Sequence, residues 1–73
     1  MKANICGEKI KGLREEANMK QVELATALEV EHQIEIDQSD VSEIERGVRG
    51  VKDYELKAIA EIFEVTTDWL LEE

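Results

Sequence analysis

The chain has 73 residues, with 18 acidic and 9 basic side chains and a formal net charge of −9. This length predicts one domain, residues 1–73, near the lower limit for a self-sufficient core, and excludes a separate sensor or catalytic module. No apolar run approaches the roughly 20 residues of a membrane span, and no secretory signal opens the chain, so we expect a soluble, cytoplasmic protein.

Helix-forming residues dominate the composition. Proline is absent, and the aromatic residues are one Tyr, one Phe and one Trp. This composition predicts an all-α fold, which we expect to be a compact five-helix bundle. The first helix is expected over residues 4–17. Its inward side would carry apolar residues at helical spacing: Cys6, Ile10, Leu13 and Ala17. Cys6 is the only cysteine, which excludes an internal disulfide and indicates a core thiol in a reducing compartment.

The second helix is expected over residues 20–29. Its inward set would be Val22, Leu24, Ala25 and Leu28. Residues 30–36 alternate between apolar and polar types and predict an extended loop, pinned to the bundle by Ile34 and Ile36. His32 has no other ligand at metal-site spacing, so we expect an exposed side chain and no metal or other cofactor.

The third helix is expected over residues 38–46 and has two different faces. Asp37 is an N-cap candidate, and Gly47 can take the left-handed conformation that ends a helix. Val41 and Ile44 would point inward. The outward side would carry polar residues at helical spacing: Ser39, Ser42, Glu43 and Arg46. Taken alone, this stripe is typical of an ordinary solvated face.

The fourth helix, residues 53–63, has the clearest amphipathic pattern, with Asp53 as its candidate cap. Its inward stripe would be Leu56, Ile59, Ala60 and Phe63. Thr66 or Thr67 would cap a short last helix over residues 67–72. Two of its residues would turn back to the core: Trp69 and Leu70.

Two motifs mark the second half of the chain. Residues 42–47 read Ser-x-Ile-Glu-x-Gly, and residues 65–71 read Val-x-x-Asp-Trp-Leu-Leu. At this separation they resemble the helix-turn-helix family of phage repressors, Cro-like proteins and small bacterial regulators named for the xenobiotic response element. The similarity spans roughly residues 10–71. It implies a domain whose second helix crosses the DNA backbone and whose third helix lies in the major groove of a double-stranded operator.

The resemblance also implies which residues contact DNA. Four residues of the third helix would meet base edges: Gln38, Ser39, Ser42 and Glu43. Lys20 and Gln21 would meet a phosphate at the start of the second helix, where unpaired N–H groups favour an anion. Arg14 and Glu45 match a paired arginine and glutamate of the family, and we expect them to form a partly buried ion pair that sets the angle of the third helix.

The chain departs from the family pattern in two ways. The passage from Val30 to Val41 is longer than is usual in the family, so the turn between the second and third helices is enlarged and the aim of the third helix is harder to infer. Lys20 stands where Thr or Ser is common, so the N-cap of the second helix is lost or moved.

The negative charge argues against a polyanionic partner, but its distribution is uneven. Residues 53–73 hold seven acids and one lysine, a net of −6, while residues 1–52 hold eleven acids and eight bases, a net of −3. Residues 46–52 contain three bases and no acid: Arg46, Arg49 and Lys52. This run is either a plain basic loop or, beside the third helix, a set of phosphate contacts.

The residues predict no enzyme, because one His, one Cys and scattered carboxylates supply no paired nucleophile and base. We expect a sequence-specific transcriptional regulator, a repressor that acts by operator occupancy. The open alternative is a protein-interaction module of the same fold, an antitoxin or anti-repressor, that presents its acidic surface to a partner. No small-molecule ligand is evident.

A domain this small reads few base pairs alone, and the family usually acts as a two-fold homodimer. Ile62, Leu71 and Tyr54 fall beside the core stripes of the last two helices. They would either cover an apolar patch against a second copy or lie at the edge of the core.

Overall fold

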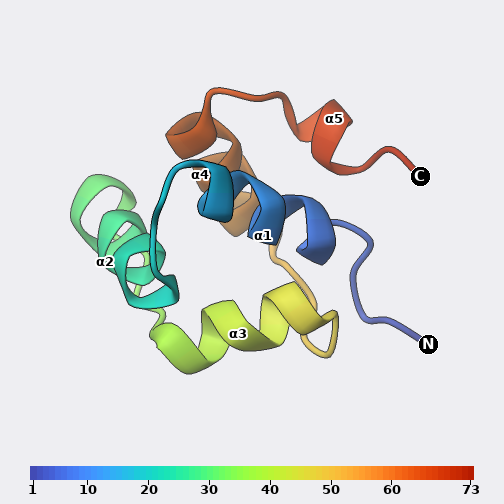
Figure 1. Ribbon diagram of the computed structural model, residues 1–73, viewed down its shortest axis with the longest axis horizontal. Coiled ribbons are helices and arrows are strands. Elements are labelled where there is room, and N and C mark those ends of the chain that lie inside the picture. Colours follow the sequence, from blue (N-terminus) through green and yellow to red (C-terminus); the bar gives the residue numbers. More distant parts are fainter.

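The computed structural model describes all residues 1–73, which form five helices and no strand (Figure 1). The helices are α1 (Gly7–Glu16), α2 (Gln21–His32), α3 (Gln38–Arg46), α4 (Asp53–Phe63) and α5 (Thr67–Leu70). The prediction of an all-α, five-helix fold is confirmed, and α3 and α4 have the predicted bounds. None of the helices has the length and apolar character that a membrane crossing requires.

The helix α3 lies along one edge of the molecule, with α1 and α2 packed against its inner side (Figure 1). The helix α4 packs against α2 and α5, and α5 lies across the molecule from α3. Twelve buried apolar residues, contributed by all five helical segments and by the turn after α2, form one continuous core. The core therefore holds α3 by its inner side and leaves its outer side uncovered.

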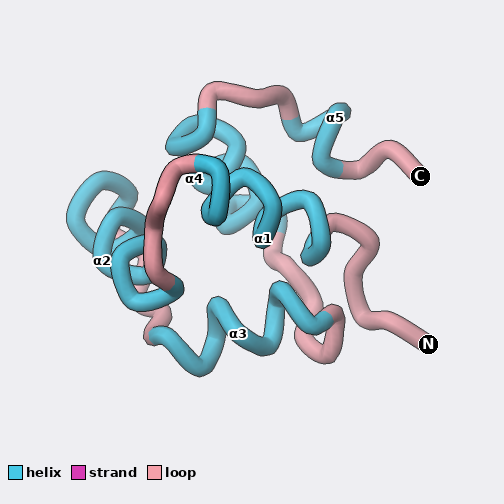
Figure 2. Tube along the Cα trace, in the orientation of Figure 1, coloured by secondary structure: helices cyan, strands magenta, loops and turns pink.

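The turn between α2 and α3 is shorter than predicted, because α2 continues past residue 29 to His32 (Figure 2). Gln33 ends the helix in the left-handed conformation, with a φ of 55°, and its N–H donates to the carbonyl of Glu29 at 3.0 Å. The connection is residues 33–37. Ile34 is buried and Ile36 half-buried, so these two isoleucines pin the turn to the bundle, as expected.

The other helix ends follow from polar side chains close to them. The helix α1 starts at Gly7 and not at residue 4, because the side-chain oxygen of Asn4 accepts the N–H groups of Cys6 and Gly7. Lys20 does not cap α2 with its side chain, and the Glu23 carboxylate accepts the Lys20 N–H at 2.6 Å instead. The N-cap of α2 is thus replaced, in line with the expectation that it is lost or moved.

Caps also define α4 and α5. Asp53 is the first residue of α4 and not its cap; Lys52 precedes the helix, and its N–H donates to the Glu55 carboxylate at 2.9 Å. Thr66 caps α5 by accepting the Trp69 N–H at 3.0 Å. The helix α5 ends at Leu70, two residues earlier than predicted.

Three residues predicted to point inward are exposed. Ala17 lies just past the end of α1, Val22 is 50% exposed, and Trp69 is 39% exposed. A bundle of this size has too little interior to cover every apolar side chain. The Trp69 ring is covered instead by the ammonium group of Lys9, 4.9 Å from the ring centre. Cys6 is buried as expected, and burial raises the pKa of its thiol.

Two glycines of α1 have opposite surroundings and give a matched test of the packing of α1 on α3. A Cβ at Gly7 would lie 2.3 Å from the Ile44 carbonyl oxygen, whereas a Cβ at Gly12 would meet nothing within 4 Å. Gly12→Ala should raise the unfolding free energy by about 0.5–1 kcal/mol, because alanine restricts the unfolded chain and favours helix. Gly7→Ala should lower it by about 1–3 kcal/mol, because the backbones must separate. Urea unfolding measures both, and equal effects would contradict the close contact.

Candidate nucleic-acid interface

The helix α3 is bounded by two local signals that the sequence carries. The Asp37 carboxylate accepts the Asp40 N–H, and the Asp40 carboxylate accepts the Asp37 N–H, each at 3.0 Å. Gly47 ends the helix with a φ of 76°, in the left-handed region. Between them, Val41 and Ile44 are buried. The helix therefore has a fixed length and one inner side, as its sequence pattern predicts.

The outer side of α3 carries the residues predicted to meet base edges. Gln38 and Ser39 are exposed, and Ser42 and Glu43 are half-buried. Arg46 is exposed at the end of the helix, and its Nε donates to the Ser42 hydroxyl at 3.3 Å. The structure thus brings these side chains onto one uncovered strip at the edge of the molecule.

Gln21 and Gln38, the first residues of α2 and α3, lie in direct contact. The Gln38 amide donates to the Gln21 side-chain oxygen at 3.3 Å, and the Gln21 amide donates to the Glu45 carboxylate at 3.0 Å. The Gln21 side chain thus links the outer surface to a buried acid. Its backbone N–H belongs to the first turn of α2, where helix donors have no partner inside the helix. A phosphate bound at this position would accept a hydrogen bond from the backbone N–H of Gln21 and not from its side chain.

Arg14 and Glu45 form the ion pair expected from the resemblance. The Arg14 guanidinium donates to both carboxylate oxygens, at 2.6 and 3.1 Å, and also to the Met19 carbonyl at 2.7 Å. The two side chains are 10% and 2% exposed. Hydrogen bonding to Glu45 raises the pKa of Arg14, so the arginine stays charged. The pair is buried more deeply than expected, and it ties α3 to α1.

Arg49, predicted to contact phosphate, has a different partner. Its guanidinium donates to both oxygens of the Glu55 carboxylate, at 2.9 and 3.0 Å, and its Nε lies 3.6 Å from an Asp40 oxygen. The Glu55 side chain is only 2% exposed. We therefore correct the interpretation of Arg49: two carboxylates neutralise it, and it joins the loop after α3 to α4. The acid-free run of residues 46–52 concealed this, because the partner lies in the next helix.

Three other predicted phosphate contacts have no carboxylate within ion-pair distance. Lys20, Arg46 and Lys52 are all exposed, and none of them forms a salt bridge. Lys20 precedes α2, Arg46 ends α3 and Lys52 precedes α4. The Lys52 ammonium lies 5.8 Å from the centre of the Tyr54 ring, and the side chain is exposed to solvent. These three cations remain available to an anionic partner.

Sequence reasoning missed Asn4, which it placed inside the first helix. The Asn4 amide donates to the carbonyls of Ile44 at 3.0 Å and Arg49 at 2.8 Å, in addition to accepting the two N–H groups at the start of α1. An asparagine side chain commonly accepts N–H groups two or three residues further along the chain, so this local turn at Asn4 is compatible with the sequence. The contact with α3 has no signal in the sequence, because 40 residues separate the partners.

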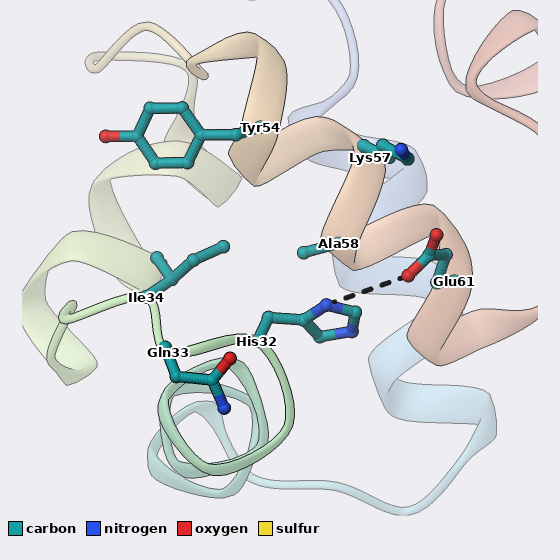
Figure 3. A pocket seen from close by; sticks show the side chains of 7 residues that line it. All are labelled: His32, Gln33, Ile34, Tyr54, Lys57, Ala58 and Glu61. Carbon is teal, nitrogen blue, oxygen red and sulfur yellow. Dashed lines mark ion pairs between the residues drawn. The ribbon is translucent and has the colours of Figure 1, made fainter.

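A hollow of about 360 Å³ lies between the end of α2 and α4 and includes Ile34, Tyr54 and Lys57 (Figure 3). His32 is half-buried there, with Nδ1 3.6 Å from a Glu61 oxygen, so the prediction of an exposed histidine is wrong. The longer α2 brings His32 against α4. The Tyr54 hydroxyl and the Lys57 side chain point away from each other, so the polar groups do not converge on one ligand position.

The helices α2 and α3, joined by a short turn and supported by α1 and α4, form a helix-turn-helix, a class of DNA-binding fold. A protein-family model described as a helix-turn-helix domain matches residues 7–73. The chain therefore belongs to the helix-turn-helix domain family, in agreement with its resemblance to phage repressors and Cro-like proteins. At this general level it is a DNA-binding regulator. No curated protein and no solved structure gives a significant match.

The buried Arg14–Glu45 pair should be a major source of stability. Glu45→Ala leaves the Arg14 charge buried without a partner, and we expect the unfolding free energy to fall by about 3–5 kcal/mol. Glu16→Ala, which removes an exposed acid from α1, should change it by less than about 0.5 kcal/mol. Urea unfolding followed by circular dichroism compares the two. Equal stability of both variants would show that the pair is not structural.

The Glu55 carboxylate should make stability depend on acid pH. Burial raises the pKa of Glu55, but hydrogen bonds from Arg49 and from the Lys52 N–H outweigh burial, and the pKa lies below its ordinary value of 4.5. The folded state therefore holds this proton less tightly than the unfolded chain. The contribution is complete above about pH 4.5 and is lost as the pH falls through the lowered folded value.

Glu55→Gln keeps the shape of the side chain and isolates this effect. At neutral pH the variant should be less stable than the parent chain, since it loses the charged partner of Arg49. The difference in unfolding free energy should shrink as the pH is lowered from about 6 to 3. Urea unfolding at a series of pH values measures it. A difference that stays constant over this range would contradict the assigned role.

Proposed function

We propose that residues 1–73 act as one cytoplasmic DNA-binding domain, a sequence-specific transcriptional repressor that works by occupying its operator. The helix α3 lies in the major groove and reads base edges with Gln38, Ser39, Ser42 and Glu43. The observation that carries this proposal is the division of α3 into two sides. The inner side is held by apolar burial and an ion pair, while the outer side is polar and uncovered.

The three cations without a carboxylate partner are compatible with this placement of α3 in the major groove. Lys20 and the first N–H groups of α2 would hold a phosphate on one flank of α3. Arg46 and Lys52 would hold phosphates on the other flank, beyond the end of α3. Arg49 leaves the set of proposed phosphate contacts, because two carboxylates occupy it. Three phosphate-binding side chains per copy therefore remain in the proposal.

A second copy of the chain completes the proposed operator contact. An apolar hollow of about 320 Å³ lies beside Ile5, Val51, Leu56 and Leu71, and Ile5 and Leu71 are each about half exposed. Two copies that each carry a charge of −9 repel one another overall, so a dimer contact is least unfavourable through a surface without charged side chains. Of the earlier candidates, Leu71 lies on this surface, Ile62 packs on the core, and Tyr54 lies at the other hollow.

One observation favours the alternative of an acidic protein-interaction module. Four of the nine basic side chains bind other groups of the same chain: Lys2 with Glu8, Lys9 with two backbone carbonyls, Arg14 with Glu45, and Arg49 with Glu55. The charge available to DNA is thus lower than the sequence suggests. An antitoxin or anti-repressor with a basic protein partner has the same fold and needs no free cations on α3.

Selection of duplexes from a random pool, followed by anisotropy titration, separates the two functions. A regulator should bind the selected duplex about a thousandfold more tightly than bulk DNA, with two copies per duplex. With three phosphate contacts per copy, the slope of log affinity against log salt should be between about −2.5 and −3 for each bound copy. A pool without enrichment would favour the protein-interaction module.

Variants of the exposed residues test the division of roles within the same titration. Lys52→Ala should weaken binding to all duplexes alike and make the salt slope shallower by about 1. Ser39→Ala and Glu43→Ala should change which bases are preferred and leave the slope nearly unchanged. Lys57→Ala, which removes an exposed cation of α4 at the other hollow, serves as the control and should leave both quantities as they are.

A further inference from the structure

The segment before α1 contacts the end of α3. The Ala3 N–H donates to the carbonyl of Gly47, the residue that ends α3, at 2.7 Å. The Lys2 side chain lies against the same glycine, since a Cβ there would be 3.0 Å from the Lys2 Cδ. Figure 1 shows this segment beside the loop that follows α3. Residues 2–4, which we call the N-terminal strap, therefore contact α3 where the helix ends.

Within the strap, Asn4 joins three parts of the molecule through one side chain. Its oxygen accepts the N–H groups of Cys6 and Gly7, at 3.1 and 2.8 Å, at the start of α1. Its amide nitrogen donates to Ile44 in α3 at 3.0 Å and to Arg49 in the following loop at 2.8 Å. An asparagine side chain offers two donors and one oxygen with two lone pairs. All of these positions are used inside the protein.

This side chain acts at a place where the backbones touch. The Gly7 Cα lies so close to α3 that a Cβ would be 2.3 Å from the Ile44 oxygen and 2.9 Å from the Glu45 oxygen. Apolar contacts alone permit small rotations of one helix on another, since they have no preferred direction. Hydrogen bonds from Asn4 are directional, so they restrict rotation of α3 relative to α1 at the end opposite Gln38, in addition to the Arg14–Glu45 pair.

We infer that Asn4 is a positioning residue that sets the orientation of α3 and of the basic loop after it, and so determines sequence selectivity without touching DNA. The inference rests on the proposed function for its consequence in DNA binding, while its structural half stands independently. Gln38 and Ser39 lie at the opposite end of α3 from the strap. A small rotation at Gly47 therefore moves those side chains most.

Asn4→Ser separates the positioning role from simple capping. Serine forms similar local turns, and its hydroxyl can still accept a backbone N–H at the start of α1, but it is too short to reach the Ile44 and Arg49 carbonyls. Thr66→Ala is the matched control, because it removes a capping side chain from α5, across the molecule from α3. Ala3→Pro breaks the other bond of the strap, since proline has no N–H. It supplies a second variant if Asn4→Ser does not fold.

Residual dipolar couplings of backbone N–H groups, measured without DNA, report the orientation of α3 relative to α1. We expect a changed orientation in Asn4→Ser, and in Ala3→Pro, and none in Thr66→Ala. A folded Asn4→Ser with parent-like couplings would overturn the inference. This measurement does not depend on DNA binding, so it separates failure of the inference from failure of the proposed function.

Anisotropy titration at a temperature where every variant is folded then tests the consequence. Asn4→Ser should lower the preference for the selected duplex over bulk DNA by about tenfold or more, the loss of one base contact, with bulk affinity nearly unchanged. Thr66→Ala should keep the full preference. Equal preference in the parent chain and Asn4→Ser would overturn the role in selectivity. A parent chain that selects no duplex would overturn the proposed function instead.

Discussion

The buried pair of Arg14 and Glu45 is the interaction on which the rest of the structure depends. The other buried side chains of α3, Val41 and Ile44, are apolar, and apolar burial holds the helix against the core without fixing its orientation. The carboxylate accepts bonds from Arg14 of α1 and Gln21 of α2, and Arg14 also binds the carbonyl of Met19. One buried acid thereby connects three helices. Removing either charge would leave the other uncompensated, which makes this arrangement hard to exchange for another.

Two further polar side chains, Asn4 and Arg49, contact the two ends of α3. Asn4 holds its last turn, and Arg49 approaches its first turn through Asp40 while binding Glu55 of α4. The orientation of the helix is thus set by groups on its inner side, at its ends and in neighbouring segments. Gln38 and Ser39 are exposed, and neither contributes to the buried core; Gln38 forms one exposed side-chain hydrogen bond, to Gln21. The outer strip is consequently free to carry sequence preference, which is the property that a reading surface needs.

The sequence predicts the elements whose signals are local and misses those set by distant contacts. The bounds of α3 follow from Asp37 and Gly47, which act within one turn of the chain. The predicted end of α2 is three residues too early, because Gln33 takes the left-handed conformation without the glycine that usually marks a helix end. The burial of His32 and the pairing of Arg49 do not follow from the sequence for another reason: their partners, Glu61 and Glu55, belong to α4, and the charges in a run of sequence do not reveal partners across the fold.

The net charge of −9 opposes DNA binding less strongly than its magnitude suggests, because many of the acids lie far from α3. The molecule is about 23 Å deep between α3 and the side that carries α5 and the end of α4. The Debye length at physiological ionic strength is about 8 Å, so the acids of that far side are largely screened from a duplex at α3. Of the three acids within α3, Asp40 faces Arg49 and Glu45 pairs with Arg14, so Glu43 is the one that forms no salt bridge. In the proposed complex, the repulsion between Glu43 and phosphate is offset only where a base donor, such as the amino group of cytosine, donates to its carboxylate, so we expect Glu43 to contribute to sequence preference.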